Sequence, residues 1–524
     1  MKNDSDRMWT TSILTVLTAC LATLIGGCAS TSSDASRPVA RINQGELRGG
    51  AEGGVERFLN IPYAAAPVGD LRWRPPMPAP SWRDSRDAGS FGPACPQPIR
   101  PAIVAGGVAD RQSEDCLQLN IWRPQGGEGL PVIVWIHGGA HVIGSGVFPA
   151  FDGARLAQQG AVVVTVNYRL GLLGYFAHPA LTNEAPTDAP LGNYGLMDQI
   201  AALKWVKDNI AAFGGDPAKV TVMGESAGAI SIEAMLANPA ARGLFDKAII
   251  QSTVGLADFD ALEQQERTGR AAASRARLSD EASAAELRAL SVEKILDMQG
   301  VRSGGRIGPF IDGRLIHESP WRAFARGAEI DIPLLIGANS DEASVILAMG
   351  APAAAARDYV GADETAARAA YGADLSAAEF SRQVLGDAWF VAPARWLAEQ
   401  TSRGSPTYLY HFDYVAAARR NTRKGAAHGS EVPYIFQTLD YLESVAGAMT
   451  DEDREFARRI SECWVSFAAN GQPDCSLVRG WPAYESSSDA LALIGPQPRV
   501  VEGFRKAQID FLLKQKFTGS IEER

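Results

Sequence analysis

Two short runs of β-branched and apolar residues constrain the fold of this chain most strongly. Residues 131–136 read Pro-Val-Ile-Val-Trp-Ile and residues 161–166 read Ala-Val-Val-Val-Thr-Val, so each strand would be apolar on both faces. Strands of this kind are typical of a parallel sheet that helices cover on both sides. Further strand runs and two stretches with helical spacing alternate along the chain, at 195–212, 220–223, 227–236, 248–250, 333–336 and 408–410. This order predicts an α/β fold with a mostly parallel central sheet.

Two alanine-rich stretches, 261–299 and 352–400, show helical spacing without strand runs. We expect helices that lie over the carboxyl edge of the sheet, where a lid or pocket wall would stand, although ordinary surface packing would give the same spacing. Length alone would allow roughly two to four domains. Because no internal repeat and no long Ser/Gly/Pro linker follows the leader, residues 38–524 are expected to form a single domain.

The first residues have the composition of an export leader. Lys2 and Arg7 precede an apolar run over residues 13–27. That run is too short for a typical membrane span and has the charge pattern of a signal peptide. The sequence therefore predicts that the chain leaves the cytoplasm.

The end of the apolar run resembles a bacterial lipoprotein signal, because Ile-Gly-Gly precedes Cys28 and a polar segment follows it. Cys20 matches less well, since more apolar residues come after it. We expect a lipoprotein-type signal peptide over residues 1–27, lipidation of Cys28 and a polar tether over residues 28–37; a plain secretory signal is the alternative. The expected location is the periplasm or the outer membrane as a lipoprotein, or otherwise the medium as a secreted protein.

Export changes the interpretation of the remaining cysteines. Cys95, Cys116, Cys463 and Cys475 would lie in an oxidising compartment, where disulfides form. Pairing between sequence neighbours predicts Cys95–Cys116 and Cys463–Cys475. Metal binding is the weaker interpretation, because no CxxC or close Cys/His spacing occurs.

Charge excludes one class of partner. The formal net charge is −10, with acidic and basic residues mixed along the chain. Without a basic stripe, nucleic-acid binding has no support. The acidic surplus favours solubility and does not indicate a substrate.

Residues 224–228 read Gly-Glu-Ser-Ala-Gly and stand between a predicted strand and a predicted helix. In this context GxSxG forms a sharp turn that exposes the hydroxyl of Ser226 at the carboxyl end of the sheet, as in the α/β-hydrolase fold. A pentapeptide of this composition is weak evidence alone, and its place between strand and helix makes it specific. Ser226 is the predicted nucleophile.

A serine hydroxyl needs a base within hydrogen-bond reach. The chain has six histidines, which are His137, His141, His178, His317, His411 and His428. In the α/β-hydrolase fold the base follows the nucleophile and the acid along the chain. His428 lies in a loop of small residues, whereas His411 lies within a strand run, so His428 is the predicted base.

The acid is expected after a strand between the serine and the histidine. Asp341 and Glu342 both follow the strand run at 333–336, and spacing does not choose between them. Residues 135–141 read Trp-Ile-His-Gly-Gly-Ala-His and resemble the HGG-type loop whose backbone amides stabilise an oxyanion. His137 is interpreted as a structural residue of that loop.

Several further motifs, in order along residues 38–516, resemble the type-B carboxylesterases, which include para-nitrobenzyl-type esterases, liver carboxylesterases and cholinesterases. The matching segments are 58–64 (Phe-Leu-Asn-Ile-Pro-Tyr-Ala), 67–73 (Pro-Val-Gly-Asp-Leu-Arg-Trp), 114–121 (Glu-Asp-Cys-Leu-Gln-Leu-Asn-Ile), 167–171 (Asn-Tyr-Arg-Leu-Gly), 192–196 (Gly-Asn-Tyr-Gly-Leu) and 213–217 (Phe-Gly-Gly-Asp-Pro).

The resemblance implies roles for particular residues. It selects Glu342 as the triad acid, and it supports His428 through the following Glu-Val-Pro-Tyr motif at 431–434. It implies that the amides of Gly139, Ala140 and Ala227 form the oxyanion hole. It also implies a disulfide between Cys95 and Cys116 near the active site.

The chain departs from the family pattern at Asn60, Gln118 and Ala343, and none of these changes removes a reactive group. The segment between Cys95 and Cys116 has no aromatic residue. Cholinesterases use a tryptophan there to hold a quaternary ammonium. Specificity for choline esters is therefore not expected.

Together these features predict one α/β-hydrolase catalytic domain that hydrolyses small to medium carboxylic esters through an acyl-enzyme, without a metal ion or an organic cofactor. A small-molecule ester is the expected partner, and membrane contact is expected only through the lipid on Cys28. An amide, a thioester or a polyester is an alternative substrate for the same groups. A non-catalytic surface binding protein is a further alternative, because some members of the family have lost the serine.

Overall fold

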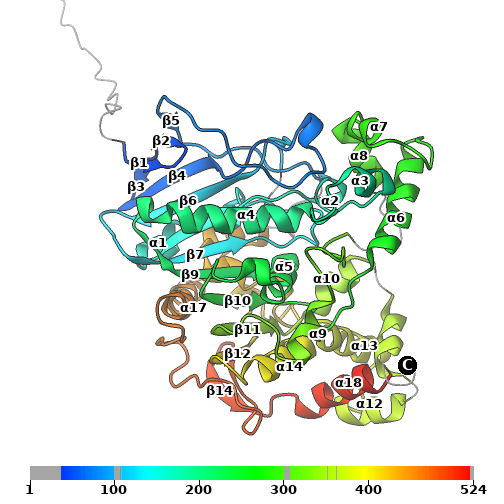
Figure 1. Cartoon of the computed structure of the whole chain (residues 1–524). Helices are drawn as coiled ribbons and strands as arrows, with labels where there is room; N and C mark the ends of the chain where they lie inside the picture. The colour runs from blue at the N-terminus through cyan, green and yellow to red at the C-terminus, as the bar shows by residue number, and fades with distance from the viewer. Residues whose placement is uncertain are drawn as a thin grey trace, which may run out of the picture. The chain divides into compact units, whose positions relative to one another are not determined.

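The predicted parallel strands form the centre of one eleven-stranded sheet (Figure 1). The computed structural model describes residues 37–99, 107, 109–299, 307–350, 352–361 and 363–519. In spatial order the strands are β14 (Arg499–Glu502), β13 (Ala490–Ile494), β12 (Thr407–Phe412), β11 (Leu334–Asn339), β10 (Lys247–Gln251), β9 (Gly215–Glu225), β7 (Leu130–Ile136), β8 (Val162–Val166), β6 (Gln118–Pro124), β4 (Val55–Pro62) and β3 (Gly50–Glu52). From β13 to β8 all neighbours run parallel. The prediction of a mostly parallel sheet is thus confirmed.

Both edges of the sheet are antiparallel, which the sequence analysis does not anticipate. β14 pairs antiparallel with β13 at one edge. At the other edge, β6 pairs antiparallel with β8, β4 with β6, and β3 with β4. A small second sheet holds β1 (Val39–Ile42), β2 (Gly45–Arg48) and β5 (Arg86–Asp87). These edge strands mix polar and apolar residues, so they lack the continuous apolar runs that identify the central strands.

The side chains of β7 show how the sheet separates two cores. Val132, Val134 and Ile136 point into one buried cluster, and Ile133 and Trp135 point into another, as the two-residue period of a strand requires. The first cluster includes α4 (Tyr194–Asn209) and α5 (Ala227–Leu236), which cross the face of the sheet turned to the viewer in Figure 1. The second includes α1 (Ala154–Gln158), α15 (Val432–Ile435) and α17 (Asp451–Asn470). Helices therefore cover both faces, as predicted.

Both alanine-rich stretches are helical. The first forms α6 (Leu262–Arg275), α7 (Ala284–Arg288) and α8 (Val292–Met298), and the second forms η7 (Ala353–Ala356), α11 (Arg357–Val360), α12 (Glu364–Tyr371), α13 (Ala377–Gly386), the π-helix η8 (Asp387–Val391) and α14 (Ala392–Thr401). α12 and α13 pack in one cluster with Ala338, near the end of β11, and Val254, just beyond the end of β10. The helices formed by the stretch 352–400 thus lie at the carboxyl ends of the central strands β10 and β11.

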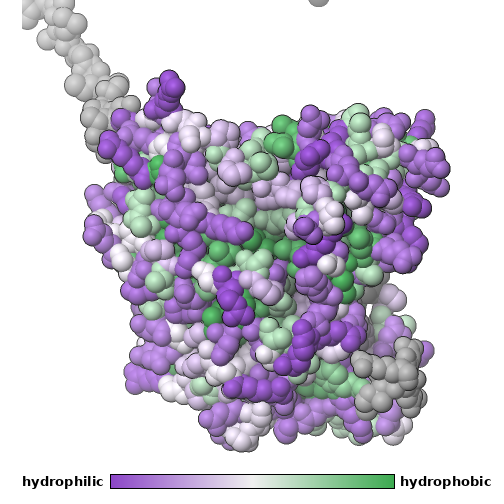
Figure 2. Space-filling model, viewed as in Figure 1, coloured by the Kyte–Doolittle hydropathy of each residue, from purple (hydrophilic) through white to green (hydrophobic). Residues whose placement is uncertain are grey.

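The remaining short elements are α2 (Gly171–Gly174), α3 (Pro179–Glu184), α9 (Pro320–Ala325), α10 (Ala343–Ala348), α16 (Leu439–Ala446), α18 (Lys506–Gly519), η2 (Gly69–Leu71), η4 (Pro149–Phe151), η5 (Ile210–Phe213), η6 (Pro239–Ala241) and η9 (Ala417–Arg419). Figure 2 shows a face dominated by hydrophilic residues, with hydrophobic residues in patches between them. Within the described ranges, no helix combines the length and the apolar character that crossing a bilayer requires. The predicted signal peptide, Cys28 and residues 29–36 of the tether lie outside the described residues.

Candidate active site

Ser226 stands on a tight turn between β9 and α5. Its backbone has φ 55° and ψ −117°, a conformation that an L-residue rarely adopts. Its N–H donates to the carbonyl oxygen of Gln251 on the neighbouring strand at 2.9 Å. A Cβ atom on Gly228 would lie 2.0 Å from the carbonyl oxygen of Ile136, and one on Gly224 would lie 2.7 Å from the carbonyl carbon of Gly228. The two glycines of the motif are therefore required by the close packing of this turn.

The loop after β7 lies against this turn. A Cβ atom on Gly138 would be 3.1 Å from the Cβ atom of Ser226. Gly139 and Ala140 both have positive φ, 105° and 55°, and Ala140 is exposed. Within the described part of the chain, no acceptor takes the backbone N–H of Gly139 or of Ala140. The loop that contacts the Ser226 turn thus carries two backbone donors without an acceptor in the described part of the chain.

Two histidines are buried away from any acid–base role. Burial lowers the pKa of His137 to about 4, and its ring stacks on Tyr168, whose hydroxyl donates to the His137 carbonyl oxygen at 2.7 Å. Burial, with a smaller contribution from Arg505, lowers the pKa of His411 to about 3, and its ring contacts Phe504 in the core. Both imidazoles are neutral at physiological pH. His137 shapes the loop, and His411 packs within β12.

Glu342 and His428 meet beyond the end of β11. The distance between Glu342 Oε2 and His428 Nδ1 is 2.5 Å. The other carboxylate oxygen of Glu342 accepts from the Ser252 hydroxyl at 2.5 Å and from the Asn339 backbone N–H at 2.7 Å. Glu342 is only 1% exposed, so these hydrogen bonds hold the carboxylate in one orientation against the imidazole.

Asp341, the neighbouring carboxylate, points to a different partner. Its side chain forms an ion pair with Arg382 of α13 at 2.7 Å. Its backbone N–H donates to the carbonyl oxygen of Ala426 at 2.8 Å, which ties the turn to the loop that precedes His428. Asp341 therefore contributes to the framework around the site, whereas Glu342 contacts the imidazole.

The second nitrogen of His428 faces the nucleophile turn. His428 Nε2 lies 3.1 Å from Oε1 of Glu225, the residue directly before Ser226. Among the described contacts, no hydrogen bond joins Nε2 to the Ser226 hydroxyl. Such bonds are often long in unliganded enzymes and tighten when substrate binds. The backbone N–H of His428 donates to Ser344 Oγ at 3.0 Å, and Phe390 packs on the imidazole at 4.8 Å between ring centroids.

Three carboxylates set the protonation of His428. Burial alone lowers its pKa, but Glu342 first, then Glu225 and Glu431, more than reverse this effect and raise the pKa to about 9. Burial raises the pKa of Glu225 to about 8, against the attraction of His428. The two groups titrate together, because the negative charge of Glu225 favours the imidazolium and the imidazolium favours the ionised carboxylate. The sequence analysis missed Glu225; the signal was its place within the GxSxG motif at the end of a buried strand.

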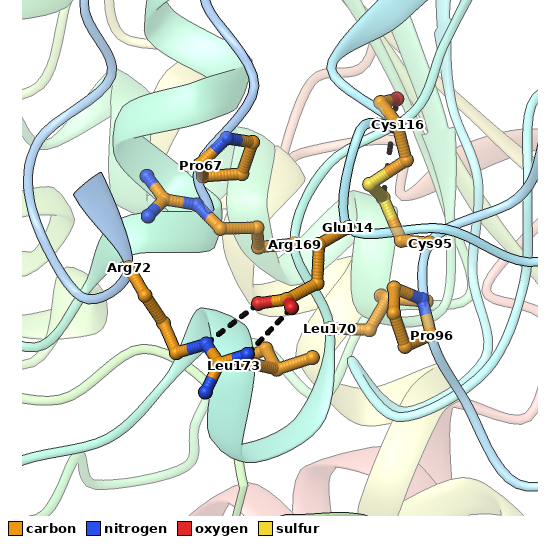
Figure 3. A pocket seen from close by; sticks show the side chains of 9 residues that line it. All are labelled: Pro67, Arg72, Cys95, Pro96, Glu114, Cys116, Arg169, Leu170 and Leu173. Carbon is orange, nitrogen blue, oxygen red and sulfur yellow. Dashed lines mark hydrogen bonds and ion pairs between the residues drawn. A yellow bond between two sulfur atoms is a disulfide. The ribbon is translucent and has the colours of Figure 1, made fainter. Parts of the chain in front are cut away.

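The cysteines pair as predicted, as Cys95–Cys116 and Cys463–Cys475, with S–S distances of 2.04 Å and 2.06 Å. The disulfides indicate a compartment outside the reducing cytoplasm. Figure 3 shows a cavity beside Cys95–Cys116 in which the Glu114 carboxylate faces the Arg72 guanidinium, with the closest atoms at 2.6 Å. This ion pair anchors the end of the disulfide loop. Within the described residues, no cluster of His, Cys, Asp and Glu has the arrangement of a metal site.

Comparison with known proteins agrees with this architecture. The model of the "Carboxylesterase family" matches residues 36–371 and 365–512. The chain is 39% identical over 473 residues to the para-nitrobenzyl esterase of Bacillus subtilis (strain 168), covering 87% of this chain and 94% of that protein. It is 38% identical over 460 residues to the fumonisin B1 esterase of Sphingopyxis macrogoltabida, covering 84% of each protein.

A solved carboxylesterase structure from Geobacillus stearothermophilus superposes with a TM-score of 0.79 at 33% identity, covering 90% of this chain and 100% of that one. The similarity therefore extends over most of this chain and the whole of the solved one. Small-molecule esters are the substrate class that the names of the relatives support. The chain belongs to the carboxylesterase family and is a serine carboxylic ester hydrolase with the α/β-hydrolase fold.

Proposed function

We propose that Ser226, His428 and Glu342 form the catalytic triad of this esterase, and that the backbone amides of Gly139, Ala140 and Ala227 form its oxyanion hole. The observation that supports this most directly is the orientation of His428. One imidazole nitrogen contacts Glu342 at 2.5 Å, and the other faces the turn that holds Ser226. A histidine placed in this way can move a proton between a serine hydroxyl and a substrate while the carboxylate stabilises its charged form.

In the proposed reaction, the Ser226 hydroxyl attacks the ester carbonyl while His428 Nε2 accepts its proton. The developing oxyanion accepts hydrogen bonds from the loop amides and from Ala227 at the start of α5. His428 then gives the proton to the departing alcohol, which leaves an acyl group on Ser226. A water molecule, deprotonated by His428, attacks the acyl carbonyl and releases the acid. Apart from the ester and the water molecule, every group in this cycle belongs to the chain itself.

We further propose that the substrates are small to medium carboxylic esters. The names of the relatives support esters of differing structure, and the absence of an aromatic residue between Cys95 and Cys116 argues against choline esters. We propose export through a signal peptide over residues 1–27, lipidation of Cys28, a tether over residues 28–37 and one catalytic domain over residues 38–524. The lipoprotein-like pattern around Cys28 and the two disulfides support export.

Hydrolysis of p-nitrophenyl acetate by the wild-type protein and by Ser226→Ala tests the triad. We expect kcat to fall by about 10⁴-fold or more in the variant, together with loss of covalent labelling by a fluorophosphonate. Ser444→Ala, which changes an exposed serine on α16, is the matched control and should behave as wild type. Equal turnover by Ser226→Ala and wild type would refute the nucleophile assignment.

A further inference from the structure

Gln251, the last residue of β10, contacts both the turn that holds Ser226 and the segment that follows His428. Its carbonyl oxygen accepts the N–H of Ser226 at 2.9 Å. Its side-chain Nε2 donates to Glu431 Oε1 at 2.8 Å, and its Oε1 accepts from Trp464 Nε1 at 3.2 Å. Gln251, Glu431 and Trp464 are all fully buried. One residue thus joins the nucleophile turn, the segment just after His428, and α17.

Glu431 also contacts Asn339, the last residue of β11, the strand that precedes Glu342. Its second oxygen accepts from Asn339 Nδ2 at 2.5 Å. The same Asn339 amide donates to the carbonyl oxygen of Ala427 at 2.8 Å, one residue before His428. The Asn339 backbone N–H donates to Glu342. The polar network Gln251–Glu431–Asn339 therefore contacts two members of the proposed triad directly, at the Ser226 N–H and the Glu342 carboxylate. It contacts the residue before His428 through the Ala427 carbonyl oxygen.

Burying a polar network of this kind lowers the stability of a core relative to apolar packing, unless all its hydrogen bonds are formed. Gln199, on α4, provides the contrast, because it is equally buried and neither atom of its amide has a hydrogen-bond partner within the described residues. Gln251 differs from Gln199 in directing both ends of its amide at defined partners. This difference indicates a role in geometry rather than in packing.

We propose that Gln251 is a positioning residue which, through Glu431, sets the separation between the Ser226 turn and the His428 loop; this inference rests on the proposed triad. The nucleophile turn is fixed by β9 and α5, whereas the loop over residues 425–431 lies outside the named strands and helices and has a single β-bridge, between Ala427 and Asp341. The Gln251–Glu431 hydrogen bond directly links that loop to the strand beside the nucleophile. Loss of the link lets the imidazole move relative to the serine hydroxyl, and displacements of about 1 Å cost up to about 100-fold in rate.

The test compares Gln251→Met with Gln199→Met, since methionine keeps the length of glutamine and removes its hydrogen bonds. For Gln251→Met we expect kcat on p-nitrophenyl acetate to fall by about 10- to 100-fold, with KM within about threefold of wild type because the binding pocket is untouched. Fluorophosphonate labelling of Ser226 should slow by a similar factor. Gln199→Met should keep wild-type kcat and labelling rate. Circular dichroism at the assay temperature establishes that both variants are folded.

Equal kcat for Gln251→Met and Gln199→Met, with both proteins folded, would overturn the proposal. So would a loss in Gln251→Met that appears only in KM. If Gln251→Met does not fold, Gln251→Asn serves as the second variant, because it keeps a buried amide on a side chain that is one methylene shorter. The same fall in kcat is expected for Gln251→Asn. Wild-type kcat in Gln251→Asn would also overturn the proposal. Failure of the triad itself is distinguishable, because wild-type protein would then resist the fluorophosphonate at Ser226.

Discussion

Ser226 stands on a turn that backbone packing holds in place, whereas His428 stands on a loop that is held mainly by side-chain hydrogen bonds. On the nucleophile side, Gly224, Gly228 and Gly138 allow main-chain segments to approach so closely that a single Cβ atom would clash. On the histidine side, the position of the imidazole depends on side-chain hydrogen bonds to Glu342 and Ser344.

This difference predicts how each side fails. The nucleophile side should be damaged by adding an atom, because its spacing is that of close-packed backbone. The histidine side should be damaged by removing a hydrogen-bonding or charged group, because side-chain contacts supply most of the interactions that orient the loop, beside one backbone bridge at Asp341 and Ala427. Substitutions of both kinds, with matched controls, test the comparison.

Among the substitutions that test this comparison, the largest effect is expected from Glu342→Gln. The amide has no charge to stabilise the imidazolium and can hold the wrong tautomer of His428, so kcat should fall by about 10³- to 10⁴-fold. Asp341→Asn is the matched control one residue away, where the structure shows no contact with the imidazole, and it should lose less than about tenfold. Steady-state kinetics on p-nitrophenyl acetate measure both. Equal losses in the two variants would contradict the separate roles of these carboxylates.

On the nucleophile side, Gly139→Ala should lower kcat by about 10²- to 10³-fold, the size of the loss of one oxyanion donor. The added Cβ atom would lie 2.1 Å from the carbonyl oxygen of Ile143, so the loop must shift. Gly160→Ala is the control, because Gly160 also has positive φ, 95°, but has no atom within 4 Å of the added Cβ. It reports the cost of the backbone conformation alone. Wild-type kcat in Gly139→Ala would show that the loop tolerates added atoms.

A smaller effect is expected from Arg382→Gln, which removes a charge on the histidine side. Arg382 bridges Asp341 and Glu379, and Glu379 in turn pairs with Lys424, just before the histidine loop. We expect kcat to fall by about threefold to tenfold, through a small displacement of the loop. Arg458→Gln on α17 is matched, since Arg458 also bridges two carboxylates, Glu455 and Glu462. If both variants keep wild-type kcat, this ion-pair network does not position the loop.

Glu225→Gln should change the pH dependence more than the maximal rate. Activity requires neutral His428 and is lost as pH falls through its pKa, which Glu225 helps to raise. A neutral glutamine removes that attraction, so the pKa of His428 falls and the acid limb of kcat/KM moves to lower pH, by up to about one unit. A pH profile of both proteins measures the shift. An acid limb that stays in place or moves to higher pH would show that Glu225 does not act on His428.

Local sequence pattern was sufficient for the central fold because buried parallel strands are apolar on both faces. The strands β7, β8 and β10 and the turn at Ser226 follow from such runs and from the GxSxG motif. The antiparallel edges did not follow, since half-exposed strands have mixed composition. Asn60, a departure from the family pattern, has φ 59°, a conformation that asparagine adopts more readily than most residues. The backbone conformation in the folded chain accounts for asparagine at this position, and the neighbouring sequence does not predict it.

By itself, the sequence determined the fold class and the candidate serine and histidine, because each depends on a local motif or on chain order. Spacing limited the acid to two adjacent carboxylates, and the family resemblance selected Glu342 from them. The tertiary structure decided which carboxylate faces the imidazole, placed Glu225 beside it and brought Gln251, Glu431 and Asn339 together beneath the site. These contacts join strands and loops far apart in the chain. No local sequence pattern specifies these contacts, because they depend on which strand ends become neighbours when the parallel strands pack into the sheet.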